Sequence, residues 1–182
     1  IYEMIFQNRI EAYNFPMGVL MHLHREIAAK RPGLVTAVGL RTFVDPRING
    51  AKMNEITRED LIEVIKLQGK EYLFYKTFPI QVAIIRGTTA DEDGNITMEH
   101  EVSFSVTLYQ AMAARNCGGK VIAQVKRAAA RGSLNPQMVR VPGILVDAVV
   151  VDEGQKQATG IDYDPSASGE LKKPWARIEK VP

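Results

Sequence analysis

The sequence predicts an α/β fold built on a mainly parallel, open sheet with helices on both faces. Residues 82–85, 120–126 and 144–152 carry this prediction, because each is a short, apolar and β-branched run. Such runs are typical of parallel strands that are buried on both faces. Helical patterns alternate with these runs along the chain, as they do in α/β proteins.

Residues 9–50 are expected to hold one strand, one helix and a long loop. Residues 9–15 alternate in polarity and predict a short strand. Pro16 then marks the start of a helix, where its missing N–H costs nothing. Apolar residues recur at helical spacing over residues 17–30, and Pro32-Gly33 ends this helix. The irregular stretch 34–50 follows, and long loops inside compact domains are often functional.

A second helix is expected to begin at Thr57. Residues 57–60 have the pattern of a capping box, and Leu61, Ile62 and Ile65 give one apolar stripe. Gly69 ends this helix, and the aromatic stretch 71–75 predicts a strand.

The second half begins with a tight turn at residues 91–95, where Gly94 supplies a positive φ. A third helix is predicted over residues 105–116, ended by Cys117-Gly118-Gly119. Residues 128–136 read as a connection with one helical turn. We expect a domain over residues 1–152, followed by an extended linker or docking tail over residues 153–182, where apolar residues become sparse.

Composition excludes several classes of protein. The 182 residues suffice for one domain with a sizeable core. A net charge of +2 is too small to argue for nucleic acid or an anionic membrane, and no apolar run approaches the length of a membrane span. The single Cys117 leaves no internal disulfide and fits the cytoplasm, or the mitochondrial matrix in a eukaryote. Because the chain opens without Met on a helical pattern, we expect it to begin inside a larger protein.

The residues alone support little chemistry. His22 and His24 are two positions apart on a helix and cannot share a metal, His100 is expected to be exposed, and zinc-ligand and nucleotide-binding motifs are absent. Glu99 and Glu101 alternate along an extended segment and share one face, where two carboxylates can perform acid–base work. A solvated strand end is the simpler reading, by roughly three to one.

Several segments in preserved order resemble the family I coenzyme A transferases of the propionate, acetate and acetoacetate type. These segments are EAYNFPMGVL (11–20), TFVDPR (42–47), ITREDLIEVI, EYLFYK, IRGTTADEDGNITMEHE, VRVPGILVDAVVVD and the tail DYDPSASGELKKP. The resemblance covers the later part of the family's first, α-type half. It implies the coenzyme A transferase fold, whose general form the sugar-phosphate isomerases share.

The resemblance also implies an activity. A glutamate carboxylate would attack an acyl-CoA and form a glutamyl-CoA thioester, from which a second carboxylic acid collects the CoA. The family's nucleophilic glutamate belongs to a motif of the second half that this sequence lacks, so no catalytic residue is assigned here. Coenzyme A is then a substrate, with no permanently bound cofactor or metal. The expected partners are a second, β-type half or subunit and further copies of the protein, without nucleic acid or membrane.

Two segments are the candidates for the substrate pocket and oxyanion region. They contribute Phe15, Pro16, Met17, Gly18, Gly39, Arg41, Thr42 and Asp45. Met17 stands where the family commonly has glutamine, whose amide faces the active site. Arg41 replaces a family glycine in a loop bordering the acyl pocket, where a guanidinium can bind a substrate carboxylate or simply lie on the surface.

Two alternatives remain open at this point. The first is a non-catalytic scaffold or interaction domain that keeps the fold. The second is a sugar-phosphate isomerase, although no phosphate-binding loop with basic residues at a helix N-terminus is evident. A glutamate-glycine motif downstream of this chain would favour the transferase.

Overall fold

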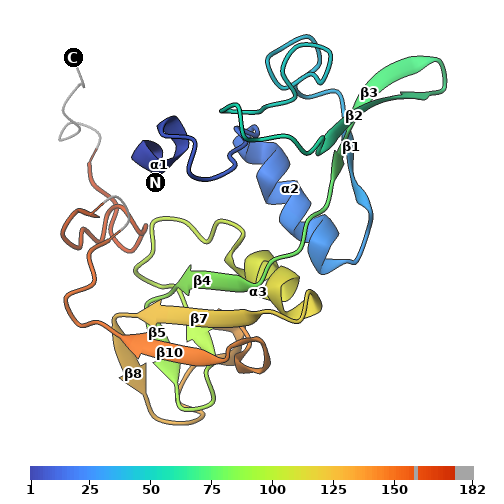
Figure 1. Ribbon diagram of the computed structural model, residues 1–182. Helices are drawn as coiled ribbons and strands as arrows, with labels where there is room; N and C mark the ends of the chain where they lie inside the picture. Colours follow the sequence, from blue (N-terminus) through green and yellow to red (C-terminus); the bar gives the residue numbers. More distant parts are fainter. Residues whose placement is uncertain (158–159, 175–182) are drawn as a thin grey trace. The chain divides into compact units, whose positions relative to one another are not determined.

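The computed structural model describes residues 1–157 and 160–174, which form two compact units (Figure 1). The first unit is Ile1–Pro79 and the second is Ile80–Pro182. Among the described residues, no helix combines the length and apolar character needed to cross a membrane.

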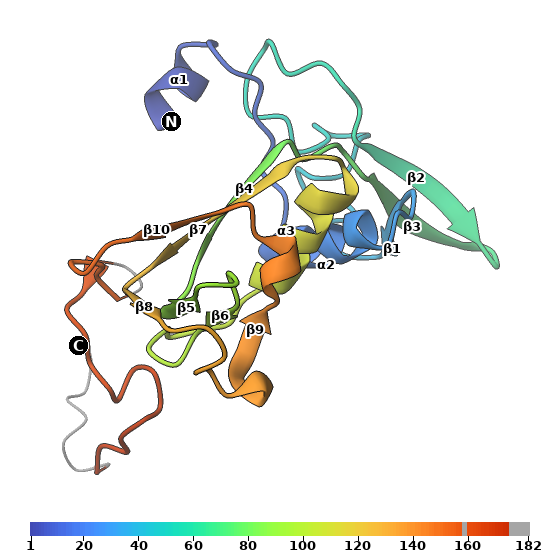
Figure 2. The ribbon, with the colours of Figure 1, turned by 90° about the horizontal axis from the view of Figure 1, so that it is seen from below.

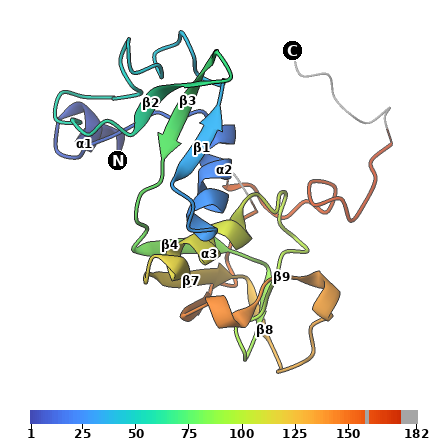
Figure 3. The same ribbon diagram turned by 90° about the vertical axis from the view of Figure 1, so that its right-hand side faces the viewer.

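The first unit packs a helix against an antiparallel sheet. Its elements are α1 (Tyr2–Phe6), α2 (Met17–Ala28), β1 (Gly33–Thr36), β2 (Ile62–Leu67) and β3 (Lys70–Lys76). The strand order is β1-β3-β2, with β3 in the centre (Figure 3). The buried face of α2 and the inward side chains of β3 share one core, in which Leu23, Leu73 and Tyr75 are fully buried.

The second unit holds a three-stranded parallel sheet and a four-stranded mixed sheet. The parallel sheet has the order β10-β7-β4, from β4 (Val82–Arg86), β7 (Lys120–Val125) and β10 (Ala148–Val151). Helix α3 (Thr107–Asn116) packs against β4 and β7 (Figure 2). The mixed sheet has the order β8-β5-β6-β9, from β5 (Thr89–Asp91), β6 (Ile96–Thr97), β8 (Arg127–Ala129) and β9 (Val139–Val141). Two short 3₁₀ helices, η1 (Pro136–Met138) and η2 (Gly143–Leu145), flank β9.

The α/β class is confirmed, but the expectation that residues 82–85 and 144–152 are buried on both faces is wrong for this chain. In the later run only Ala148–Val151 form a strand, and all four residues are exposed. Ala83 and Ile85 point into the core beneath α3, while Val82 is 52% and Ile84 is 76% exposed. Successive side chains of a strand alternate between faces, so β4 turns one apolar face toward the core and the other outward.

The second predicted helix is also wrong, since residues 62–67 form strand β2. This segment pairs with β3 in register Ile62↔Tyr75 to Leu67↔Lys70, across the two-residue turn Gln68-Gly69. Both turn residues have positive φ, as a tight hairpin of this kind requires. No helix follows Thr57. Its hydroxyl oxygen instead accepts a hydrogen bond from the backbone N–H of Ala12 at 2.8 Å.

Residues 9–15 do not form the predicted strand. Only an isolated antiparallel bridge between Tyr13 and Lys52 is present there. By contrast, helices α2 and α3, strands β3 and β7, and the end of α3 at Gly118 with φ +76° agree with the predictions. The connection after β7 holds strand β8 and the 3₁₀ turn η1, where we expected one helical turn.

The predicted turn at residues 91–95 is confirmed and also anchors a distant segment. Asp91 Oδ1 accepts the backbone N–H groups of Asp93 (3.0 Å) and Asn95 (2.9 Å). Asn95 Oδ1 in turn accepts the backbone N–H of Gly143 at 2.9 Å. The hydrogen bonds of Asn95 hold the pKa of Asp91 below its usual value, so this carboxylate stays ionised and continues to accept these hydrogen bonds.

The stretch after residue 152 lies against the second unit as far as it is described. Gln155 and Gln157 are buried there. Residues 158–159 and 175–182 of the predicted tail lie outside the described residues. A domain boundary at residue 152 and a role in docking a second half stay predictions.

We predict that Gly143→Ala destabilises the protein by about 1–3 kcal/mol, the usual cost of overpacking. A Cβ at this position would stand 2.0 Å from the carbonyl oxygen of Asp93. The free energy of unfolding from urea titration, followed by far-UV circular dichroism, measures the loss. Gly18→Ala is the control, because its Cβ meets nothing within 4 Å and alanine favours a helix, so it should be neutral or stabilising. Equal stability of Gly143→Ala and the parent protein would contradict the packing.

Candidate functional site

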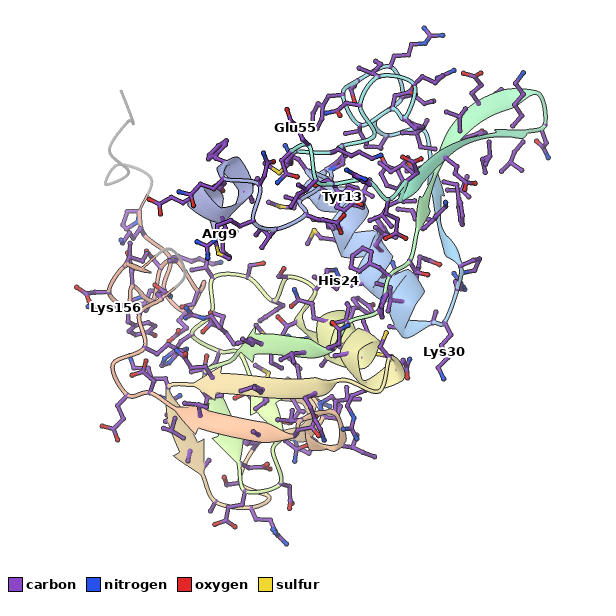
Figure 4. The ribbon with its side chains drawn as sticks, in the orientation of Figure 1. Arg9, Tyr13, His24, Lys30, Glu55 and Lys156 are labelled. Atoms are coloured by element: carbon purple, nitrogen blue, oxygen red, sulfur yellow. The ribbon has the colours of Figure 1, made fainter. Side chains whose placement is uncertain are left out.

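The predicted pocket residues all belong to the first unit and lie in two segments. One is the start of α2, residues 15–18, and the other is the loop from Gly39 to Arg47. The side chains around them are drawn in Figure 4, where Tyr13 and His24 mark the approach to α2 and the helix itself.

The start of α2 combines a buried anchor with an exposed first turn. Phe15 is buried in the core of the unit, and Pro16 is the N-cap with an extended backbone. Met17 follows with 78% exposure, and Gly18 is exposed beside it. Pro16 has no side-chain cap, and the first backbone N–H groups of a helix have no intrahelical acceptor. This turn therefore presents backbone donors and the partial positive charge of the helix N-terminus.

The loop is organised by the buried carboxylate of Asp45, which is 1% exposed. Its Oδ2 accepts the backbone N–H of Arg41 at 2.9 Å, and its Oδ1 accepts the backbone N–H of Arg47 at 3.1 Å. The Arg47 guanidinium bonds both oxygens, at 2.9 and 2.7 Å. These hydrogen bonds, from the Arg47 side chain above all, hold the pKa of Asp45 well below its usual range.

Tyr75 joins the two segments. Its ring meets Phe15 edge-on, with centroids 5.5 Å apart, and its hydroxyl donates to the carbonyl oxygen of Val38 at 2.7 Å. A Cβ on Gly39 would lie 2.6 Å from that hydroxyl oxygen, and Gly39 has φ +95°, which suits glycine. Burial raises the pKa of Tyr75 to about 12, with a further contribution from Asp45. The phenol therefore stays protonated and continues to donate.

The structure divides the predicted residues into supports and exposed groups. Phe15 and Asp45 are buried, and Pro16 and Gly39 are half-buried. Met17, Gly18, Arg41 and Thr42 are exposed and available to a ligand of this unit. The Thr42 hydroxyl donates to the carbonyl oxygen of Gly39 at 2.8 Å, so it also closes the loop.

Arg41 has φ +61°, in the left-handed region that side chains other than Gly, Asn and Asp rarely adopt. The hydrogen bond from its N–H to Asp45 holds this conformation. A backbone of this kind explains why glycine suits the position, and it leaves the guanidinium of Arg41 exposed.

The two carboxylates of the second unit do not act as a pair. Glu99 Oε1 accepts from the Thr89 hydroxyl at 2.6 Å and from Arg127 at 2.7 Å. Glu101 Oε1 instead accepts from Arg86 and Gln155, each at 3.2 Å. Residues 99–101 are not part of a strand, so the predicted shared face is wrong.

Burial raises the pKa of Glu99, but hydrogen bonds from Thr89, Thr97 and Arg127 outweigh it and leave the pKa below its ordinary value. An ionised carboxylate held in this way is poorly suited to give up a proton. His100 is half-buried, contrary to expectation, and stacks on Tyr163 with ring centroids 4.3 Å apart.

Within residues 1–157 and 160–174, no group of three or more His, Cys, Asp or Glu side chains is placed to hold a metal ion. His22 is exposed, while His24 is half-buried with its Nδ1 2.7 Å from the carbonyl oxygen of Leu20.

Comparison with known proteins decides the family. The family model described as "Coenzyme A transferase" matches residues 1–152. The chain belongs to the coenzyme A transferase family. It is 49% identical over 183 residues to a caffeate CoA-transferase of Acetobacterium woodii, covering 99% of this chain and 35% of that relative. It is 47% identical over 160 residues to the acetate CoA-transferase YdiF of Escherichia coli K12, covering 88% and 30%.

A solved structure of this coenzyme A transferase family has the same fold. The crystal structure of the E. coli O157:H7 acyl-CoA transferase YdiF, a thioester complex with CoA, superposes with a TM-score of 0.88 at 44% identity. The superposition covers 94% of this chain and 35% of YdiF. The chain thus spans about a third of the length of these relatives, and the expected fold is confirmed.

Sequence reasoning missed two residues that build this site. Tyr75 and Arg47 lie inside the resembling segments EYLFYK and TFVDPR, but neither was a candidate. The sequence indicated only that residues 71–75 form a strand; the structure shows that Leu73 and Tyr75 lie on its buried face. The pairing of Arg47 with Asp45 follows from a loop conformation that spacing alone does not reveal.

We predict that Asp45→Asn lowers the free energy of unfolding of the complete protein by about 2–3 kcal/mol near pH 7. The amide loses the charge and, in either orientation, turns its NH2 group toward the N–H of Arg41 or of Arg47, which are bound by different oxygens of Asp45. The folded pKa of Asp45 lies below its unfolded value, so its contribution is full above about pH 4 and is lost as the pH falls through the folded pKa.

Urea titrations at several pH values test this prediction. The stability difference between the parent protein and Asp45→Asn should shrink progressively below about pH 4. Asp60→Asn is the matched control, because the Asp60 side chain is 71% exposed in its pair with Lys52, and exposed pairs contribute little. A difference that does not change with pH would show that the Asp45 charge does not stabilise the loop.

Proposed function

We propose that the complete protein containing this chain is an acyl-CoA:carboxylate CoA-transferase acting on short-chain acyl groups. Its nucleophilic glutamate lies outside residues 1–182, and this chain supplies one wall of the active site. The similarity to CoA-transferases along 99% of this chain carries the proposal. The related YdiF enzyme was crystallised as a thioester complex with CoA, which supports the same intermediate here.

The reaction balances as two successive acyl exchanges. The glutamate carboxylate attacks the acyl-CoA carbonyl and expels the CoA thiolate, which leaves a mixed anhydride. The thiolate then attacks the glutamyl carbonyl and releases the first carboxylate, giving the glutamyl-CoA thioester. A second carboxylate then attacks the glutamyl-CoA thioester and expels the CoA thiolate, which leaves a new mixed anhydride. The thiolate attacks the acyl carbonyl of this anhydride, which releases the new acyl-CoA and regenerates the glutamate carboxylate. Each step passes through a tetrahedral oxyanion, which is stabilised by hydrogen-bond donors placed in advance.

The exposed groups of the first unit suit this role. The first turn of α2 offers backbone N–H groups and a partial positive charge, and Gly18 leaves the space beside them open. On the loop, Arg41 presents a guanidinium that can hold a carboxylate in two-point contact. The buried network of Asp45 and Tyr75 keeps this loop and the helix start in fixed positions.

Trapping of the covalent intermediate tests the proposal. The complete protein is incubated with acetyl-CoA and sodium borohydride, which reduces a glutamyl-CoA thioester to an alcohol. We expect irreversible loss of transferase activity and the corresponding mass change on one glutamate outside this chain. Borohydride without acyl-CoA is the control and should leave activity intact. Activity that survives acyl-CoA and borohydride together, or a modified residue within this chain, would contradict the proposal.

We predict that Met17→Gln in the complete protein raises kcat/KM for short acyl-CoAs by about tenfold to a hundredfold. The side chain of Met17 is 78% exposed at the start of α2 and cannot donate a hydrogen bond. A single oxyanion donor is typically worth about a hundred- to a thousandfold in rate, of which an added amide should recover part.

Met138→Gln is the control for this prediction, since Met138 is an exposed methionine of the second unit, outside the proposed pocket wall. It should leave the steady-state rates unchanged. If Met17→Gln behaves like this control, the side chain at position 17 does not approach the reacting carbonyl.

A further inference from the structure

A polar segment crosses the end of the parallel sheet in the second unit. We call the described residues 152–157 and 160–164 the strap; Lys156, labelled in Figure 4, belongs to it. The strap contacts Arg86 and Gly87 at the end of β4, Gln124 near the end of β7, and the loop at residues 100–101. Strands β4, β7 and β10 run parallel, so these contacts lie at their carboxyl ends, the edge where open α/β sheets bind ligands.

Gln155 and Glu101 form the centre of the contact. Gln155 Nε2 donates to Glu101 Oε1 at 3.2 Å and to the carbonyl oxygen of Gly87 at 2.9 Å. Its Oε1 accepts from Gln124 at 3.1 Å. Both Gln155 and Glu101 are buried, at 8% exposure each.

Arg86 closes the same network from the other side. Its guanidinium donates to Glu101 Oε1 at 3.2 Å and to the carbonyl oxygen of Lys156 at 2.6 Å. One carboxylate oxygen thus binds the sheet through Arg86 and the strap through Gln155. Buried polar groups are costly when unpaired, so displacing the strap would deprive the Glu101 carboxylate and the carbonyl of Gly87 of the Gln155 donor.

A second set of contacts holds the outer part of the strap. Gln157 Nε2 donates to the carbonyl oxygen of His100 at 2.9 Å, and Gln157 Oε1 accepts the backbone N–H of Asp164 at 2.9 Å. Tyr163 stacks on the imidazole of His100. The strap is thus fixed at two points to the loop that carries Glu101.

We propose that Glu101 and Gln155 are positioning residues, which fix the strap over the carboxyl edge of the sheet and so set the course of the chain that leaves this unit. The second part of the inference rests on the proposed function, in which the nucleophilic glutamate lies outside this chain. A strap held in place fixes the course of the chain toward that part of the protein. Neither Glu101 nor Gln155 takes part in the chemistry.

Substitution of Gln155 by its nearly isosteric acid tests the contact directly. Gln155→Glu places a second carboxylate beside Glu101 and removes the donors to Glu101 and Gly87. Hydrogen exchange followed by mass spectrometry should show amides of the strap exchanging at least about tenfold faster. The amide of Asp164, which donates to Gln157, and that of Asp152, which donates to the carbonyl of Val125 at 2.8 Å, report on the two ends. Exchange in β7 should stay unchanged, which shows that the unit remains folded.

Exchanging the two residues should restore the protection from hydrogen exchange that Gln155→Glu loses. In the double variant Glu101→Gln with Gln155→Glu, the amide and the carboxylate exchange places and can again bond each other. We expect at least half of the lost protection to return, because the coupling of two residues in direct contact is not additive. Gln137→Ala is the matched control, as Gln137 is an exposed glutamine of the same unit, and it should exchange as the parent does. Protection unchanged in Gln155→Glu, or no rescue in the double variant, overturns the contact. If Gln155→Glu fails to fold, Gln155→Asn, which shortens the reach of the amide, takes its place.

Steady-state kinetics of the complete protein test the positioning role. We expect Gln155→Glu to lower kcat at least about tenfold with little change in KM for acyl-CoA, since misplaced reacting groups lose rate while binding persists. The rate is normalised to the sites that borohydride traps, so that a smaller folded fraction does not imitate the effect, and the double variant should restore it. Faster exchange with an unchanged normalised kcat overturns positioning. A parent protein without transferase activity overturns the proposed function instead, and the exchange data still decide whether the strap is held as described.

Discussion

The hydroxyl of Tyr75 imposes the constraint on which the first unit depends. Its ring fills the core against Phe15, and a buried hydroxyl needs a hydrogen-bond partner, which is the carbonyl of Val38. That bond brings the loop down onto β3 and leaves room there only for a glycine at position 39. Beyond it, the carboxylate of Asp45 accepts the backbone N–H groups of Arg41 and Arg47. Two buried polar side chains, Tyr75 and Asp45, therefore fix the position of the irregular loop. The exposed residues of this loop are held in place through them.

The second unit uses the same device at its own loops. Asp91 accepts a backbone N–H of the turn between β5 and β6, and Asn95 in that turn accepts the N–H of Gly143. Gln155, after β10, donates to the carbonyl oxygen of Gly87 at the end of β4. In each case a side-chain oxygen or amide takes the place of a strand partner for backbone groups outside the sheets. Few of these contacts are local in sequence, so they fix the connections between elements more than the elements themselves.

This explains which parts of the structure could be predicted. Helices α2 and α3 and strands β3 and β7 follow from local periodicity and stop signals, and the family followed from the order of short segments. The strand at residues 62–67 could not be predicted in this way. An apolar stripe preceded by a capping pattern fits a helix as well, and only the pairing with β3 shows that the segment is a strand. The candidate segments of the site were placed by resemblance, whereas Tyr75 and Arg47 act through contacts that no spacing reveals. His100 looked exposed because its partner, Tyr163, lies 63 positions away along the chain.

The left-handed backbone at Arg41 has a bearing on how the sequence of this loop can vary. The conformation is held by the carboxylate of Asp45, through the N–H that every residue except proline possesses, and its cost to a residue other than glycine is of the order of 1 kcal/mol. A lineage can therefore exchange side chains at position 41 without rebuilding the loop. Single substitutions at position 41 should therefore change the exposed surface of the loop while the scaffold beneath it stays unchanged.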